Sequence, residues 1–274
     1  MTVPKNMRGF SSAIINSGMA IGLAIGLGVA GPVYLFFNNW RAPFLSLAIP
    51  TMLVALIYQA VMRDARPAEK VTVPWSEILG NKNLMLLNVA IFCSQYGFWT
   101  VLTWGPTFFM AERGLSLTVS GLYTAIVAVT AIPAGIWFGR NSDRFGRKKL
   151  ALIILPLTAL TVAAMGYVMS LPMLVAALIA YGIVGKFSFD PVSVSWVGDH
   201  VARTNPEAMG TAIAVFNMSG MLSSIAAPVV VGWIRDITGS FVGGFYLGAV
   251  ILLIGMVVVA FIDETVEEKK TASA

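Results

Sequence analysis

Two ionisable residues, Lys186 and Asp190, stand inside an otherwise apolar stretch of the sequence. A lone charge in an apolar interior costs several kcal/mol, so such residues usually face a watery cavity or a partner of opposite charge. Because they are four residues apart, the two side chains share one helical face and can neutralise each other. Two interpretations stay open: a structural ion pair, or a site in which Lys186 attracts an organic anion and Asp190 exchanges a proton.

Polar and aromatic side chains form a stripe in the apolar stretch that begins near residue 84. Asn88, Gln95 and Trp99 recur at i, i+7 and i+11, which is one narrow face of a helix, and Tyr96 lies beside them. Amides in an apolar environment need hydrogen-bond partners, so these side chains either join helices or contact a substrate. Asn217 is similarly open to two interpretations, a hydrogen bond at a helix kink or the lining of a cavity.

The sequence holds no grouping that is typical of catalysis or metal binding. The single histidine, His200, follows Asp199 at a helix end, and no nucleophile or paired carboxylate accompanies it. The single cysteine, Cys93, excludes a disulfide or a thiolate metal site within one chain. We therefore predict that the protein is not an enzyme and has no catalytic residue, metal or cofactor. Mid-helix glycines are interpreted as close-packing surfaces and not as a phosphate cradle, namely Gly18, Gly22, Gly26 and Gly28.

The composition excludes a water-soluble globule. Of the 274 residues, 57% are hydrophobic and 11% are charged, against roughly a quarter charged in soluble domains. The net charge of +5 does not indicate nucleic acid, because the basic residues occur in short blocks between apolar runs. Such blocks are typical of the cytoplasmic surface of a membrane protein. We predict an all-helical protein with about eight membrane spans, at 10–35, 43–62, 84–110, 119–139, 150–169, 173–197, 211–234 and 243–262.

The distribution of lysine and arginine predicts the orientation in the membrane. If residue 1 is cytoplasmic, fourteen basic residues lie in inner segments, three lie in outer loops, and Lys186 lies within a span. Inner loops of membrane proteins carry this excess of positive charge. We therefore predict a multi-pass protein of the cell membrane with both termini in the cytoplasm and lipids as neighbours.

An internal repeat predicts how the chain is organised. The segment 9–16 (GFSSAIIN) precedes 210–217 (GTAIAVFN) by 201 positions, and Phe44 meets Phe245 at the same offset. The first two helices are then counterparts of the last two, as in transporters built from parallel repeats. About 117 residues with four further helices would be expected before residue 1. The predicted divisions are a remnant of an N-terminal half (1–62), a cytoplasmic linker (63–83), a six-helix C-terminal half (84–262) and a tail (263–274).

The loop after the fourth predicted span carries a recognisable motif. Residues 139–149 read GRNSDRFGRKK, which resembles the loop motif G-x-x-x-D-R-x-G-R-K-K of the major facilitator superfamily. In that family the motif lies between helices 2 and 3 and again between helices 8 and 9. The resemblance implies a twelve-helix fold of which this chain carries helices 5–12, truncated before helix 5.

Further residues resemble the anion:cation symporter branch of that superfamily. The resemblance implies H⁺-coupled symport of a small organic anion (a carboxylate), by alternating access and without nucleic acid, in the cell inner membrane. It also places the helix of Gln95, Tyr96 and Trp99 against the cavity, so we predict that these three residues contact the substrate. We predict substrate contact for Lys186 and Asn217 as well. Asp190 is predicted to couple transport to protons. The alternative is a non-transporting membrane fragment or interaction protein, and we expect the truncated chain alone to transport poorly. The residues that carry the resemblance are Trp104, Pro106, Glu112, Trp196, Asp199 and the run 227–240.

The resemblance also implies that the 139–149 loop acts as a conformational latch. Asp143 is expected to dock on the start of the helix that begins at Gly210, where free N–H groups favour a carboxylate by roughly 0.3–2 kcal/mol. Gly139 and Gly146 would permit close approach, and Arg144 and Arg147 would steady the acid. The alternative is that the basic residues only fix topology and touch anionic lipid headgroups.

Overall fold

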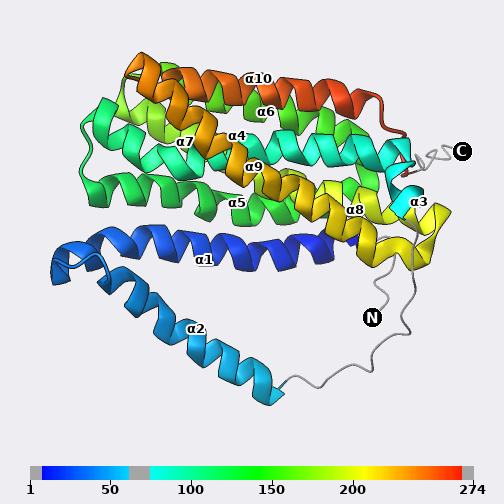
Figure 1. Ribbon diagram of the computed structural model, residues 1–274, viewed down its shortest axis with the longest axis horizontal. Coiled ribbons are helices and arrows are strands. Elements are labelled where there is room, and N and C mark those ends of the chain that lie inside the picture. The colour runs from blue at the N-terminus through cyan, green and yellow to red at the C-terminus, as the bar shows by residue number, and fades with distance from the viewer. Residues whose placement is uncertain (1–7, 62–74, 267–274) are drawn as a thin grey trace, which may run out of the picture.

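The computed structural model describes residues 8–61 and 75–266, and every regular element among them is a helix (Figure 1). Residues 63–74 of the predicted linker and residues 267–274 of the predicted tail lie outside the described residues. In chain order the elements are α1 (Arg8–Phe37), α2 (Ala42–Val61), α3 (Trp75–Leu79), α4 (Lys82–Arg113), α5 (Leu117–Phe145), α6 (Arg147–Tyr167), α7 (Leu171–Val184), α8 (Lys186–Thr204), the short 3-10 helix η2 (Pro206–Ala208), α9 (Met209–Thr238) and α10 (Val242–Ala260).

Among the residues that the structure describes, eight helical segments are long and apolar enough to cross a membrane, which confirms the predicted all-helical class and number of spans. The helix boundaries differ from the predicted ones where polar residues continue a helix. The span predicted at 119–139 is α5, which runs through a polar stretch to Phe145. Helical hydrogen bonds persist at a membrane surface while side chains reach water, so an apolar run marks only the middle of such a helix.

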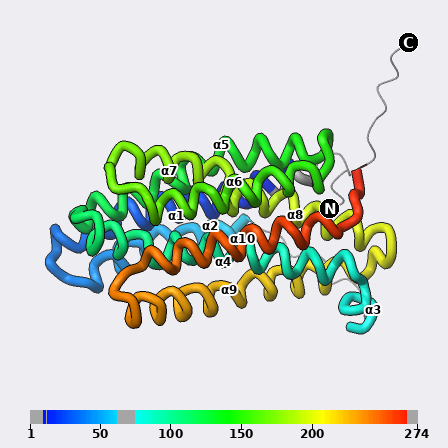
Figure 2. The backbone as a smooth tube through the Cα atoms, turned by 90° about the horizontal axis from the view of Figure 1, so that it is seen from above, coloured from blue at the N-terminus to red at the C-terminus, as the bar shows by residue number. Residues whose placement is uncertain are grey.

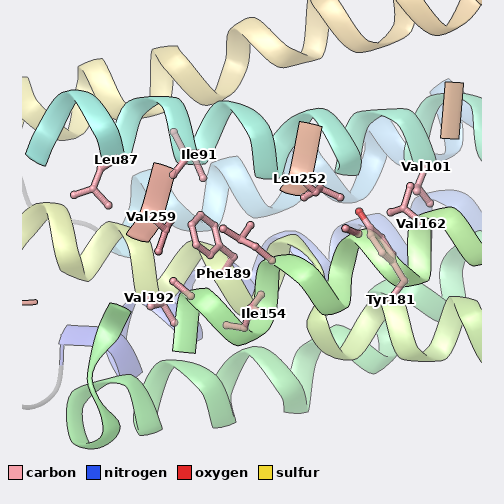
Figure 3. Close-up of a cluster of buried hydrophobic side chains, with 14 of the residues drawn as sticks. Leu87, Ile91, Val101, Ile154, Val162, Tyr181, Phe189, Val192, Leu252 and Val259 are labelled. Carbon is pink, nitrogen blue, oxygen red and sulfur yellow. The ribbon is translucent and has the colours of Figure 1, made fainter. Parts of the chain in front are cut away.

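The centre of the bundle is α4 (Figures 1 and 2). It packs against α9 and α10, and α10 also packs against α6. Figure 3 shows this core, in which Leu87 and Ile91 of α4 lie with Leu252 and Val259 of α10, all four buried. Between membrane-spanning helices, close packing supplies the attraction, because lipid tails are as apolar as these side chains.

The first helix, α1, lies along α5 and also contacts α8. The two helices run in opposite directions: a Cβ atom on Gly31, late in α1, would lie 3.2 Å from the Cα of Thr118, early in α5. Ala13, early in α1, shares a small gap with Gly135, late in α5. The second helix, α2, packs against α1 and buries none of its residues.

The predicted repeat has a counterpart in the helix boundaries. The last residues of α1 and α9, Phe37 and Thr238, are 201 positions apart, which is the offset of the repeat. Both helices contain an internal proline. These observations support the equivalence of α1 and α9, whereas the division of the chain into two halves stays a prediction.

The span predicted at 173–197 is a broken helix. It divides at Gly185, which has extended backbone angles between α7 and α8. The carbonyls freed by the break find side-chain partners: the hydroxyl of Thr158 donates to Val184 at 2.6 Å, and that of Ser188 donates to Ile183 at 2.5 Å. A break inside an apolar bundle requires this replacement of lost backbone bonds. Its consequence is that Lys186 occupies the first position of α8.

The interpretation of the α1 glycines as close-packing surfaces is wrong. Cβ atoms on Gly18, Gly22 or Gly26 would have no neighbour within 4 Å, and one on Gly28 would make an ordinary contact with Leu122 at 3.8 Å. Gly18 and Gly22 are exposed on α1, and the sequence could not distinguish their side of the helix from the face that meets α5. The close approaches are made elsewhere, as by Gly135, whose Cβ would lie 2.7 Å from the carbonyl oxygen of Phe187.

Gly182 in α7 is the glycine that we expect to tolerate substitution least. A Cβ atom there would overlap the hydroxyl of Thr130 and lie 2.7 Å from the carbonyl oxygen of Val127 in α5. Gly182→Ala should therefore destabilise the protein by about 1–3 kcal/mol, the usual cost of overpacking. Gly18→Ala is the matched control and should be neutral or stabilising, because alanine favours a helix. Thermal unfolding in detergent would measure both, and equal stability of the two variants would contradict the α5–α7 contact.

Candidate functional site

Lys186 and Asp190 form a buried ion pair, as their spacing predicts. The ammonium of Lys186 lies 2.6 Å from Oδ2 of Asp190, and the two side chains are 5% and 9% exposed. The second carboxylate oxygen of Asp190, Oδ1, is buried and has no hydrogen-bond partner among the described residues. A buried carboxylate oxygen without a donor is costly. The two charges of the pair therefore neutralise each other, but the hydrogen-bonding capacity of the Asp190 carboxylate is not fully used.

Four helices converge on the pair. A small apolar cluster contains Ala20 of α1, Phe98 of α4, Ala131 of α5 and Phe187 of α8, all buried. The sequence alone does not distinguish these residues, because aromatic residues in an apolar stretch carry no specific signal. The cluster places α1, from the start of the chain, beside the residues expected to bind substrate.

The stripe predicted on α4 contains three buried polar atoms without partners. These are Oε1 of Gln95, the hydroxyl of Tyr96 and Nε1 of Trp99, which find no hydrogen bond within the described residues. The ring of Trp99 meets that of Phe98 edge to face, with centroids 5.4 Å apart, and so adjoins the Lys186 cluster. Gln95 points instead toward α9, where its Cγ would lie 3.3 Å from a Cβ on Gly220. The structure thus brings Trp99 near the ion pair and Gln95 to the α4–α9 contact.

Asn217 lies away from these buried groups. It is exposed on α9, one turn before Gly220, and the residues that the structure describes give it no hydrogen bond. Of its two interpretations, the hydrogen bond at a helix kink is not formed among the described residues, and substrate contact stays a prediction. Asn88, one end of the predicted stripe, is buried and makes a weak contact with the sulfur of Met85 at 3.8 Å.

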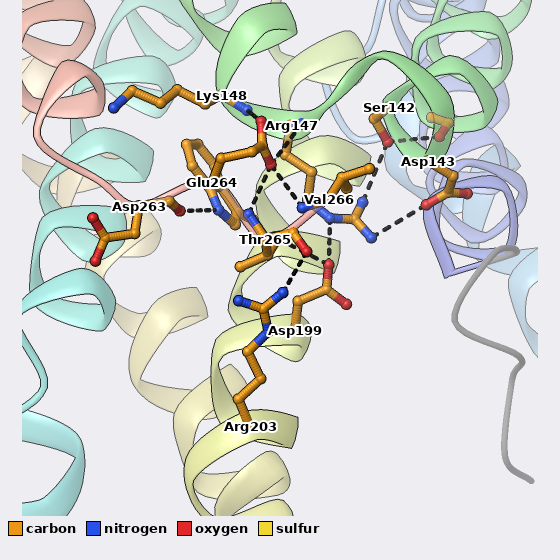
Figure 4. Close-up of polar contacts among 12 residues, drawn as sticks. Ser142, Asp143, Arg147, Lys148, Asp199, Arg203, Asp263, Glu264, Thr265 and Val266 are labelled. Atoms are coloured by element: carbon orange, nitrogen blue, oxygen red, sulfur yellow. Dashed lines mark hydrogen bonds and ion pairs between the residues drawn. The ribbon is translucent and has the colours of Figure 1, made fainter. Parts of the chain in front are cut away.

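Arg147 lies at the centre of a second polar cluster, at the end of the bundle that carries the α5–α6 loop (Figure 4). The side chain is 2% exposed. Its Nε donates to Oδ2 of Asp199 at 2.6 Å, one terminal nitrogen donates to Ser142 at 3.3 Å, and the other pairs with Asp143 at 3.2 Å. Arginine suits this position because its planar group directs several donors at once. Arg147 therefore links α5, α6 and α8.

Glu264 caps α6 from a distant part of the sequence. Its carboxylate accepts hydrogen bonds from the backbone N–H groups of Arg147 at 3.2 Å and Lys148 at 2.9 Å, the first residues of the helix. It also accepts from the N–H groups of Thr265 and Val266. Gly146 has a φ of +95° and lies so close that a Cβ would be 2.7 Å from the carboxylate. A carboxylate at a helix start is favoured by the free N–H groups and the helix dipole.

The segment around Glu264 is fixed on both sides. Nε1 of Trp196 donates to the carbonyl of Asp263 at 3.0 Å, and the hydroxyl of Thr265 donates to Asp199 at 3.1 Å. The amide of Asn83 donates to the Asp263 carboxylate at 2.9 Å, and this hydrogen bond lowers the pKa of Asp263 below its usual value. The predicted tail, from residue 263, thus begins as part of the folded bundle.

The position predicted for Asp143 beside the start of the helix near Gly210 is wrong. Figure 2 shows α5 and α9 on opposite sides of the bundle, with α4 and α10 between them. The helix that lies along α5 is α1, and their antiparallel order brings its first turn, from Arg8, to the level of Asp143. The sequence carried no information on which helix start faces the loop. Gly139 is buried in α5, and Arg144 is exposed.

A third polar contact closes the opposite end of the bundle. Glu112, at the end of α4, accepts from the hydroxyl of Ser240 at 2.9 Å and from the N–H of Phe241 at 2.6 Å. Nε1 of Trp104 donates to the carbonyl of Pro228 at 3.0 Å. These bonds join α4 to α9 and to the start of α10. Among the described residues, no group of three or more His, Cys, Asp or Glu side chains is placed to hold a metal ion.

Comparison with known proteins agrees with this architecture. The sequence matches the Major Facilitator Superfamily over residues 1–203 and again over 87–274. The chain belongs to this superfamily. A solved structure of a bacterial homolog of the human lysosomal transporter Spinster, in an inward-facing and occupied conformation, covers 94% of the chain with a TM-score of 0.58 and 16% identity, and the chain covers 65% of it. This likeness confirms the superfamily fold.

Several curated relatives of this superfamily member carry the names of organic-acid transporters. A putative tartrate transporter of Agrobacterium vitis is 23% identical over 97% of the chain and 67% of its own length. A probable galactarate/D-glucarate transporter, GudP, of Bacillus subtilis (strain 168) is 25% identical over 90% of the chain and 61% of its own length. A hexuronate transporter of the same organism is 23% identical over 94% and 66%. The chain thus spans about two thirds or less of the length of these relatives, and their names agree with the resemblance to the anion:cation symporter branch.

Proposed function

We propose that this superfamily member takes part in secondary active transport of a small organic anion, coupled to H⁺ and operating by alternating access. The observation that carries the proposal is the buried Lys186–Asp190 pair, whose second carboxylate oxygen has no donor among the described residues. The unpartnered atoms of Gln95, Tyr96 and Trp99 support it, because buried polar atoms usually find partners and a ligand would supply them. Asn217, exposed on α9, is proposed as a further contact from this helix, which packs against α4.

The ion pair provides a physical basis for coupling an anion to a proton. While Asp190 is ionised, it holds the ammonium of Lys186, and a carboxylate must compete for that charge. Protonation of Asp190 would release Lys186 to the anion, so that proton and anion enter the site together. An uncompensated charge in the membrane interior is disfavoured, which selects the states in which the site is neutral.

Binding and uptake experiments test this proposal separately. Purified chain in lipid nanodiscs would be titrated with tartrate, galactarate, D-glucarate and glucuronate, at pH 5.5 and pH 7.5. We expect one of these acids to bind more tightly at the lower pH, because protonation of Asp190 favours the anion. Accumulation of the same acid in proteoliposomes with an imposed proton gradient would establish symport. Binding that is unchanged in Lys186→Met would refute the site.

We further propose that both termini are cytoplasmic and that the α5–α6 loop is a latch on the start of α1. The excess of basic residues at this end supports the orientation. Asp143 pairs with Arg147, and the antiparallel order of α1 and α5 brings the first turn of α1 to its level. A carboxylate near the beginning of a helix is favoured, and separation of α1 from α5 would take this end of α1 away from the loop.

Asp143→Asn tests the latch, because it keeps the shape of the loop and all basic residues. In a transporter completed with the four helices expected before α1, we expect slower transport with unchanged insertion and orientation, since a neutral amide loses most of its attraction to the Arg147 guanidinium and the helix start. Arg140→Gln, a change of an exposed residue in the same loop, is the control and should leave the rate unchanged. If Asp143→Asn transports at the wild-type rate, the loop is not a latch and its basic residues only fix the orientation in the membrane.

A non-transporting membrane or interaction protein is the second candidate. The observation that favours it is α2, which buries none of its residues and packs against α1. Such a helix offers an apolar surface to other membrane helices. Co-purification of a defined membrane partner without binding of any tested acid would support this candidate over transport.

A further inference from the structure

Apart from Asp190, the groups around the ammonium of Lys186 are uncharged but attract a cation. Its nitrogen lies 5.2 Å from the ring centroid of Phe98 and 5.1 Å from that of Phe187. The sulfur of Met19 lies 3.7 Å away, and within the described part of the chain Asp190 supplies the one charged contact. Aromatic faces and thioether sulfur attract a cation but accept hydrogen bonds weakly.

The two rings form a rigid corner. They meet edge to face, with centroids 5.7 Å apart and ring planes at 88°. Phe98 is 2% exposed and Phe187 is 3% exposed, so neither ring has room to turn away. The position of Phe187 is fixed further by Gly135, since only a glycine allows α5 to approach its carbonyl so closely. The corner therefore stays in place whether or not Asp190 is ionised.

We infer that Phe98 and Phe187 are positioning residues that keep the charged ammonium of Lys186 in place when Asp190 releases it. A lysine ammonium has three donors and is strongly hydrated, so without such groups it would lose its charge or move toward water. The two rings stabilise the charge yet leave donors unused, which a carboxylate ligand can accept. The inference rests on the proposed function for its ligand, but the contact between the rings and the ammonium does not.

Fluorination of a single ring tests the inference with little change in the shape of the side chain. Replacing Phe98 with its mono-, di- and trifluoro analogues weakens the negative ring face stepwise. In the full chain, purified in detergent, we expect the trifluoro ring to lower Tm by about 2 to 4 °C in a wild-type background. The shift should be larger in Asp190→Asn, where the rings are the main remaining partners, and absent in Lys186→Met. Equal shifts in all three backgrounds would overturn the inference.

Phe189, which lies on α8 with Phe187, provides the matched control. It is fully buried in the main core and has no cation over its ring among the described residues. Its fluorination should shift Tm equally in the wild type, Asp190→Asn and Lys186→Met, and a Lys186-dependent shift there would count against the assignment to Phe98 and Phe187. For the acid that binds in nanodiscs, trifluorination of Phe98 should weaken binding about tenfold.

The two readouts separate the inference from the proposed function. Background-dependent Tm shifts without binding of any tested acid would establish the positioning of Lys186 and refute the anion site. Acid binding that is unaffected by fluorination of either ring, together with equal Tm shifts in all backgrounds, would retain the anion site and overturn the role of the rings.

Discussion

Replacement of Lys186 alone by methionine is expected to destabilise the protein by about 3–5 kcal/mol, because it leaves the buried Asp190 carboxylate without its cation. The carboxylate has no other hydrogen-bond partner among the described residues. Replacement of both residues, as Lys186→Met with Asp190→Leu, should cost less than the single change, since apolar residues of similar size often substitute for a buried pair. The midpoints of chemical unfolding in detergent would measure both.

The same variants distinguish the two interpretations of the pair. If the pair is structural, the double variant folds and retains uptake. If it serves transport, the double variant folds and loses both acid binding and uptake. Normal uptake by the folded double variant would end the functional interpretation, and a double variant less stable than either single one would contradict the ion-pair energetics.

The sequence predicted the membrane fold well because its signals are strong and local. Runs of about 20 apolar residues define spans, and the motif around Asp143 identifies the superfamily. The Lys186–Asp190 pair was predictable for the same reason, since four-residue spacing on a helix brings side chains together. The helix break at Gly185 was not, because glycine in an apolar run is as compatible with a continuous helix as with a break.

The long-range contacts could not be predicted from local spacing. Glu264 lies 117 positions beyond Arg147, and Phe98 lies 88 positions before Lys186, so no periodicity connects them. The sequence predicts that the 139–149 loop docks on the wrong helix, because spacing along the chain does not show which helices lie side by side in the folded bundle. The α1 glycines were misinterpreted because spacing does not show which face of a helix meets its neighbour.

Arg147 carries the second large effect, since its side chain joins three groups in a nearly dry cluster (Figure 4). Arg147→Met should destabilise the protein by about 3–5 kcal/mol, because Asp199 and Asp143 both lose the guanidinium as a partner inside the bundle. Arg147→Lys keeps the charge, yet one ammonium cannot reproduce the planar fork that reaches Asp199, Ser142 and Asp143. It should therefore cost about 1–3 kcal/mol.

Arg144 and Asp199 supply the controls for this prediction. Arg144 belongs to the same loop but is exposed, so Arg144→Met should change the free energy of unfolding by less than about 0.5 kcal/mol. Combining Arg147→Met with Asp199→Leu should recover part of the loss, because the pair 2.6 Å apart is then removed together. Equal unfolding midpoints for Arg147→Met and Arg144→Met would show that Arg147 acts only as one more positive charge of the loop. In that case the start of α6 would be held by the Glu264 carboxylate through backbone N–H groups, and the Arg147 side chain would not contribute.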